Sequence, residues 1–404
     1  NSAANFWIQS NADGAEVGIC GSVSVISFDN DVKAYIDQLA EINQNDAVEY
    51  RTGNQDVSVI SNLVDQIVYF SGNITLPGVG IEKKDKNFKI TGSLGGGGTS
   101  SETAGVGASV IIFLQENLST AEIRDGVRLY AVNADVKSDT DILNVVISAA
   151  GGEGGKFGFE GTFTLLDLNN GTTAWVSNTA RLVVVNNVNV IAKDNTFIVD
   201  ASGVIAQSGN IGVGGTVALN TVKRNTKAKV GSPLETGGVG KPALGELTIK
   251  ADNVNIEAMN DGFILSLGVA GAVAKTKTDP DPNASKSAPK GGGNYGVGIS
   301  ACVVINNIQD EVMAALRMAS LEARKLIIAS KNYTRVISAG GSVAIVTNDG
   351  TSAALAGAYT QNDVTNINKA IIDNSEVELT EDLILEAESR EEIISVSASG
   401  SGAS

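Results

Sequence analysis

The sequence predicts an all-β fold, a right-handed parallel β-helix (β-solenoid) of about six laps with two loop insertions. Three observations support this prediction. A long pattern recurs along the chain, strand-like alternation lies at the same place in each copy, and the composition suits many strands. Of the 404 residues, 46 are glycine, only 6 are proline and 5% are aromatic. Such a composition favours strands with tight corners over helices.

Six segments of the chain match when they are laid over one another. They begin at Gly18, Gly105, Gly158, Gly212, Gly296 and Ala354. The starts lie 87, 53, 54, 84 and 58 residues apart, so the basic period is near 53 residues. Within each segment, hydroxyl side chains alternate with branched apolar ones, which is the pattern of a half-buried strand. A repeat of this kind predicts laps that stack on one another.

Small residues recur three positions after five of the six starts. Glycine stands there at Gly21, Gly161, Gly215 and Gly357. We interpret these as corner glycines, because glycine permits a tight turn where a side chain would clash.

Asparagine recurs twelve positions after four of the six starts. The six positions hold Asn30, Asn117, Asn170, Arg224, Ile308 and Asn366. A side-chain amide both donates and accepts hydrogen bonds, so stacked asparagines can bond to one another from lap to lap. We therefore predict a structural Asn ladder formed by Asn30, Asn117, Asn170 and Asn366, which also satisfies backbone groups at a corner.

The whole chain, 1–404, is interpreted as a single elongated β-solenoid. Two large insertions account for the longer laps, at about 38–98 and about 276–295, with a smaller one at about 231–242. Residues 35–42 (YIDQLAEI) look helical. Residues 309–327 would also pass as a helix on propensity, but their equivalents in other laps have no helical pattern, so we predict strands there.

Both ends of the chain fall within a lap, and no cap is evident. We therefore expect partners end to end, either flanking repeats of a longer array or copies of the chain that form a fibre.

Composition excludes several classes of chemistry. The chain has no histidine, which rules out Ser-His-Asp and His-based zinc sites, and its two cysteines cannot form a CxxC site. A net charge of −16 without a basic block argues against nucleic-acid binding, and no apolar run is long enough for membrane insertion. No cofactor is expected, except that Asp279, Asp281 and Asn283 could bind calcium weakly through alternating oxygen ligands.

The motif GxxG(S/T)VxVxxxxN, followed by AxI, resembles the repeats of leukotoxin-type giant filamentous adhesins. Close matches are GVGGTVALN at 212–220, GVGASVIIFLQEN at 105–117 and KAIIDNSEVEL at 369–379. The resemblance implies a parallel β-helix on the outside of a bacterial cell, involved in attachment or filament formation. It also implies a host or cell-surface ligand. The insertions at 38–98 and 276–295 depart from the family pattern.

These observations favour an extracellular structural or adhesive module that is not an enzyme. One alternative is a carbohydrate-active parallel β-helix enzyme, since such enzymes use carboxylates on an outer face. Candidate acidic pairs such as Asp29 with Asp31, or Asp139 with Asp141, recur at no consistent position of the repeat. A second alternative is a self-assembling extracellular fibre subunit that is joined end to end.

Overall fold

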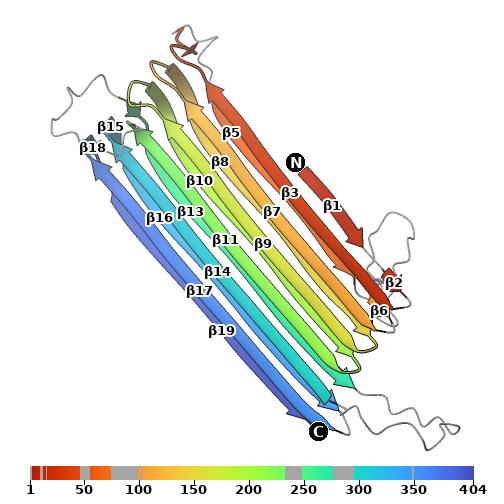
Figure 1. The fold of residues 1–404 in the computed structure, drawn as a ribbon. Coiled ribbons are helices and arrows are strands. Elements are labelled where there is room, and N and C mark those ends of the chain that lie inside the picture. The colour runs from red at the N-terminus through yellow and green to blue at the C-terminus, as the bar shows by residue number, and fades with distance from the viewer. Residues whose placement is uncertain are drawn as a thin grey trace, which may run out of the picture.

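The computed structural model describes residues 2–9, 12–14, 16–45, 55–73, 99–101, 103–232, 248–275, 295–347 and 350–404. These residues form nineteen strands and no helix. Neighbouring strands of each sheet pair in parallel, and the two sheets lie one over the other as two layers (Figure 1). The all-β, parallel β-solenoid fold that the sequence predicts is therefore confirmed.

One layer, called sheet B here, has six described strands. In chain order these are β3 (Val17–Ile36), β7 (Ala104–Ile123), β9 (Phe157–Val176), β11 (Ile211–Gly231), β14 (Tyr295–Arg317) and β17 (Thr351–Asp373). Each strand pairs with the next one in this order, so that β3 and β17 are the edges of sheet B.

The other layer, sheet A, has thirteen described strands. Its long strands are β1 (Ser2–Gln9), β5 (Asp56–Asn73), β8 (Arg128–Gly154), β10 (Arg181–Ser208), β13 (Asn253–Lys275), β16 (Lys325–Thr347) and β19 (Leu383–Ala403). Its short strands are β2 (Ala12–Gly14), β4 (Glu41–Ile42), β6 (Thr99–Ser101), β12 (Ile249–Lys250), β15 (Ser320–Ala323) and β18 (Glu376–Leu379).

One lap is a single wide coil with a long strand in each layer. The chain runs along β9 in sheet B, turns, returns along β10 in sheet A, and then enters β11 beside β9. At about 3.3 Å per residue the 28-residue β10 spans about 90 Å, whereas seven strands about 4.8 Å apart span only about 30 Å. The described part of the molecule is thus a slab whose longest dimension follows the strands (Figure 1).

Alternate residues of the long strands point between the layers, as the regular burial pattern of β9 shows. The apolar ones gather in three clusters, which are represented by Leu182, Leu166 and Val304. Hydroxyl and amide rows lie among these clusters and bond across the layers. Thr164 and Ser202, for example, are 2.8 Å apart between their hydroxyl oxygens. The interior therefore combines apolar packing with hydrogen-bonded polar rows.

The corner glycines are predicted wrongly. Gly21, Gly161, Gly215 and Gly357 lie inside strands of sheet B, on its outer face. The corner that follows the sheet-B strands instead uses left-handed backbone at Leu39, Gly126, Met318 and Asn374. Glycine is the residue best suited to a positive φ, and at this corner it is provided by Gly126 and, at the end of β11, by Gly231.

The register of the fifth lap also differs from the prediction. Gly212 pairs with Gly298, so the matched segment begins at Gly298 and not at Gly296. Asp310, not Ile308, is consequently the neighbour of Arg224. A slip of two residues leaves every side chain on its own face of the sheet, and the alternating pattern therefore does not reveal it.

Residues 35–42 form no helix: β3 ends at Ile36 and β4 begins at Glu41. The range 38–98 is not simply an insertion either, since β5 lies within it and pairs with β8. The strands predicted for 309–327 are confirmed by β14, β15 and the start of β16. The remaining predicted insertions, 231–242 and 276–295, fall outside the described residues except for Gly231, Ser232 and Tyr295.

Candidate functional site

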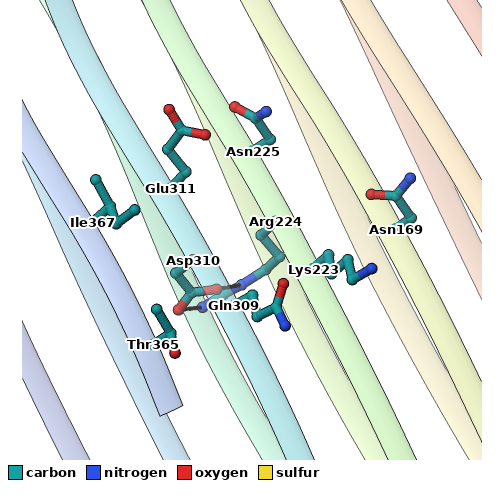
Figure 2. A pocket seen from close by; sticks show the side chains of 9 residues that line it. All are labelled: Asn169, Lys223, Arg224, Asn225, Gln309, Asp310, Glu311, Thr365 and Ile367. Carbon is teal, nitrogen blue, oxygen red and sulfur yellow. Dashed lines mark hydrogen bonds and ion pairs between the residues drawn. The ribbon is translucent and has the colours of Figure 1, made fainter.

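A shallow pocket opens on the outer face of sheet B, with a volume of about 260 Å³ (Figure 2). Its lining comes from β9, β11, β14 and β17. The residues are Asn169, Lys223, Arg224, Asn225, Gln309, Asp310, Glu311, Thr365 and Ile367. Two rows of outward side chains form the rim, one with Lys223, Gln309 and Thr365 and the other with Asn225, Glu311 and Ile367. The rim offers an ammonium group, a carboxylate and amides to a polar ligand.

Beneath the pocket, the guanidinium of Arg224 is fully buried between the two layers. Its Nε donates to Oδ1 of Asp310 at 2.8 Å, and its Nη2 donates to Oδ2 of the same residue at 2.6 Å (Figure 2). Nη2 also donates to the hydroxyl of Thr334 in sheet A at 2.7 Å. Because these bonds direct the guanidinium inward, the base of the pocket is a closed, bidentate ion pair.

Sheet A accommodates the buried arginine with a glycine and a second carboxylate. A Cβ on Gly262 would lie 2.3 Å from Nη1 of Arg224, so a larger residue would clash with the guanidinium. Asp194 places Oδ1 4.0 Å from Nη1. It also accepts hydrogen bonds from Asn170 at 2.9 Å and from Thr196 at 2.6 Å.

Burial and the neighbouring charges act in opposite directions on the pKa values of this cluster. Burial raises the pKa of Asp194, and the charge of Arg224 with the bonds from Thr196 and Asn170 offsets this only in part. Burial also acts to lower the pKa of Arg224, but the charge and hydrogen bonds of Asp310 outweigh it and raise that pKa. Asp310 thus favours the charged form of the Arg224 guanidinium, whereas burial acts against the charged form of the neighbouring Asp194.

Three of the four predicted ladder asparagines bond to one another. Nδ2 of Asn30 donates to Oδ1 of Asn117, and Nδ2 of Asn117 donates to Oδ1 of Asn170, both at 2.9 Å. The row lies inside the slab at mid-strand and not at a corner. After Asn170 it continues through Arg224 and Asp310. Asn366 occupies the next position and donates to Ser389 at 2.6 Å and to Glu391.

Sequence reasoning missed a second amide row. Nδ2 of Asn220 donates to Oδ1 of Asn306 at 3.0 Å, and Nδ2 of Asn306 donates to Oδ1 of Asn362 at 2.7 Å. With the fifth lap placed two residues too early, Asn306 did not align with Asn220. Three amides at one position of a correctly aligned repeat would have been the signal.

Asp200 is a buried carboxylate without a counterion. It is 0% exposed, and neither of its oxygens has a well-aligned hydrogen-bond donor. Burial, which the neighbouring Asn220 and Ser202 offset only in part, raises its pKa to about 7. Asp194, whose pKa burial also raises, differs from Asp200 in having Arg224 and two hydrogen-bond donors beside it.

The predicted weak calcium ligands Asp279, Asp281 and Asn283 lie outside the described residues. Within the described ranges, no group of three or more His, Cys, Asp or Glu side chains is arranged to hold a metal ion. The two cysteines, Cys20 and Cys302, are both buried and are not joined in a disulfide. No helix in the described part of the chain is long and apolar enough to cross a membrane.

The acidic pairs considered for an enzyme lie on outer faces. Asp29 and Asp31 point outward from β3, and Asp139 and Asp141 point outward from β8. Partial burial raises the pKa of Asp139, while Lys193 and Lys137 act against that shift. Asp141 accepts a hydrogen bond from Asn195 at 3.1 Å. Both members of each pair are therefore placed among polar surface side chains.

The edges of the two sheets are open along much of their length. Within the described chain, β3 pairs only with β7, and β17 pairs only with β14. The inward side chains of the two edges match: Asn30, Ala34 and Ile36 on β3 correspond to Asn366, Ala370 and Ile372 on β17. Such edges can accept further parallel strands.

Comparison with known proteins finds no matching family model, no matching curated protein and no matching solved structure.

Proposed function

We propose that the chain is a structural or adhesive module of an extracellular bacterial surface or filament protein. It acts through its scaffold and its surface contacts and not by catalysis. The observation that supports this most directly is the stack of matching laps in two open sheets, in which each lap packs on its neighbours through repeated rows. The resemblance to giant filamentous adhesins supports the extracellular location and a host or cell-surface ligand.

The rival enzyme function is tested with a polysaccharide screen. Purified chain is incubated with a panel of acidic and neutral polysaccharides, and the release of reducing or unsaturated ends is measured. We expect binding to some polymers without turnover. Turnover that disappears in an Asp139→Asn variant would overturn the proposal in favour of a carbohydrate-active enzyme.

The location is tested on intact cells. An antibody against the purified chain should label unbroken cells of the source bacterium, and brief protease treatment of those cells should remove the label. Labelling that appears only after lysis would contradict an extracellular role.

A second candidate function, an extracellular fibre subunit joined end to end, is favoured by the matching edges. If β3 of one copy continued the sheet beyond β17 of another, Asn30 would follow Asn366 in the interior row. Asn30 and Asn117 already bond in this way within the chain, at 2.9 Å. A contact between two different edges does not close on itself and generates filaments.

Electron microscopy and sedimentation velocity test this assembly. Wild-type chain should form filaments whose length grows with concentration. Asn366→Lys places a charge at the edge and should abolish them, whereas Asn169→Lys on the outer face of the central strand β9 should leave them unchanged. Wild-type chain that never forms filaments at its highest soluble concentration would contradict end-to-end assembly by this chain alone.

A further inference from the structure

The outer face of sheet B is divided into a charged half and an uncharged half. In β11 the charged outward residues begin at Lys223, and the outward residues before it, from Val213 to Leu219, are apolar. The same division holds in all six strands. The uncharged outward positions lie in 19–25, 106–112, 159–165, 213–219, 299–305 and 355–361. These positions contain no Asp, Glu, Lys or Arg and are called the apolar field below.

Large apolar side chains in the apolar field are exposed to solvent. Exposure is highest on the edge strands, where Ile19 is 69% and Leu355 66% exposed; farther in, Phe159 is 42% and Ile299 39% exposed, and the outward apolar residues of β11 are half-buried. Seven residues at about 3.3 Å and six strands at about 4.8 Å give the field an area of about 650 Å². Two such surfaces in contact would bury about 1,300 Å², which lies within the size range of specific protein interfaces. An apolar surface of this size marks an interaction site.

The surface of the apolar field is shaped into ridges and a groove. One ridge includes Val213 and the other includes Val217, and Gly215 lies between them in β11. An added Cβ would meet no atom within 4 Å at Gly215 or Gly357, and at Gly161 it would come only within 3.8 Å of one backbone oxygen. Packing within the chain therefore does not require glycine there, although glycine weakens a strand. The groove suits an interdigitating protein surface, whereas a fluid lipid surface has no need of one.

We propose that the apolar field binds the apolar field of a second copy of this chain. A two-fold axis parallel to the stack of laps and above Thr216 exchanges Gly215 with Val217. The ridge of each copy then enters the groove of the other. The same axis exchanges Val213 with Leu219, so the uncharged span from 213 to 219 maps onto itself. Complementary packing of this kind resembles the dry interface between paired β-sheets.

The distribution of charge selects this orientation. With the axis along the stack, Lys223 of β11 lies beyond the strand start of the second copy. Asp167 and Asp363, the first charged outward residues of β9 and β17, lie at the rim of the contact opposite Phe157 and Ala353. An axis along the strands would instead set Asp31 against Ile367 and Glu311 against Leu118. That arrangement would bury carboxylates without partners, which is costly. The chain carries a net charge of −16, and the chosen orientation keeps the charged halves of the two copies apart.

Analytical ultracentrifugation of matched glycine variants tests the pairing. All samples carry Asn366→Lys, so that growth at the sheet edges does not obscure pairing of the faces. The reference chain should sediment as a dimer, at twice the chain mass of 41.4 kDa. Gly215→Leu fills the groove on both copies and should weaken dimerisation by roughly 100-fold, the factor expected for an overpacked contact.

Gly203→Leu is the matched control. Gly203 lies on the outer face of sheet A, and an added Cβ there also meets no atom within 4 Å. The dimer of the Gly203→Leu variant should persist. Both variants should keep the circular dichroism spectrum and the melting temperature of the reference chain. A monomeric reference chain would overturn the proposal, as would a dimer lost in Gly203→Leu but kept in Gly215→Leu. Monomers that co-float with phosphatidylcholine vesicles would assign the apolar field to a lipid surface instead.

Discussion

The interior row that starts at Asn30 is built in two different ways along the stack. In the first three laps identical amides bond to one another, from Asn30 through Asn117 to Asn170. In the next two laps the same row holds an ion pair of Arg224 and Asp310. Amides are self-complementary and need no special neighbour, whereas a buried charge needs a partner of opposite sign. One geometric position therefore tolerates two chemistries with different consequences for stability.

The largest effect is expected where the charged part of the row loses its cation. Arg224→Met leaves Asp310 buried without its bidentate partner and removes the positive charge beside Asp194. We expect the free energy of unfolding to fall by about 5 kcal/mol, at the upper end of the range for breaking a buried pair. Urea denaturation followed by circular dichroism measures this loss.

The double variant Arg224→Met/Asp310→Leu is the control for that experiment. It removes both charges and should recover most of the lost stability, because apolar residues often replace buried pairs at little cost. A double variant as unstable as Arg224→Met would show that shape and not charge holds this part of the row together.

Asp200 extends the comparison to a buried carboxylate without a cation. Its folded-state pKa of about 7 lies above the ordinary value of 3.8, so the folded protein holds the proton more tightly than the unfolded chain. The contribution of this proton to the free energy of unfolding is fully present below pH 3.8. It is lost as the pH rises towards 7, by roughly 4 kcal/mol in total. Asp200→Asn should remove this loss.

Urea titrations across that pH range, with wild type and variant in parallel, measure the difference. The free energies of unfolding of the two proteins should differ more and more as the pH rises from acid to neutral. Parallel pH profiles would mean that Asp200 titrates normally in the folded protein.

The smallest effect is expected in the amide part of the row. Asn117→Ala removes the bonds to Asn30 and Asn170 and deprives the buried Oδ1 of Asn170 of this donor, whereas Nδ2 of Asn30 keeps its bond to Asp65. We expect a loss of about 2 kcal/mol, since a buried unsatisfied polar group costs about 1–3 kcal/mol. Asn169→Ala, whose side chain points outward, should change stability by less than about 0.5 kcal/mol. Equal losses in the two variants would deny the amide row a role in stability.

Much of the fold was predictable because it depends on periodicity. The repeat correctly indicated strands even at 309–327, where propensity favours a helix, because the equivalent segments of other laps have no helical pattern and a stacked lap must match its neighbours. The positions of Asn30, Asn117 and Asn170 followed from the same repeat. The start of the fifth lap was placed at Gly296 instead of Gly298 because a shift of two residues preserves the alternation. That error concealed the pairing of Arg224 with Asp310.

By itself, the sequence determined the strand content, the repeat period and the amide row, since each of these is a property of residues at regular spacing. Only the tertiary structure decided that one lap contains two long strands, and that Gly215 lies on an outer face and not at a corner. It also decided which residues meet across the layers. Arg224, Gly262 and Thr334 come from different laps and sheets, and their contact depends on where each turn brings the chain back over itself. The spacing of residues along the sequence does not show where those turns bring the chain.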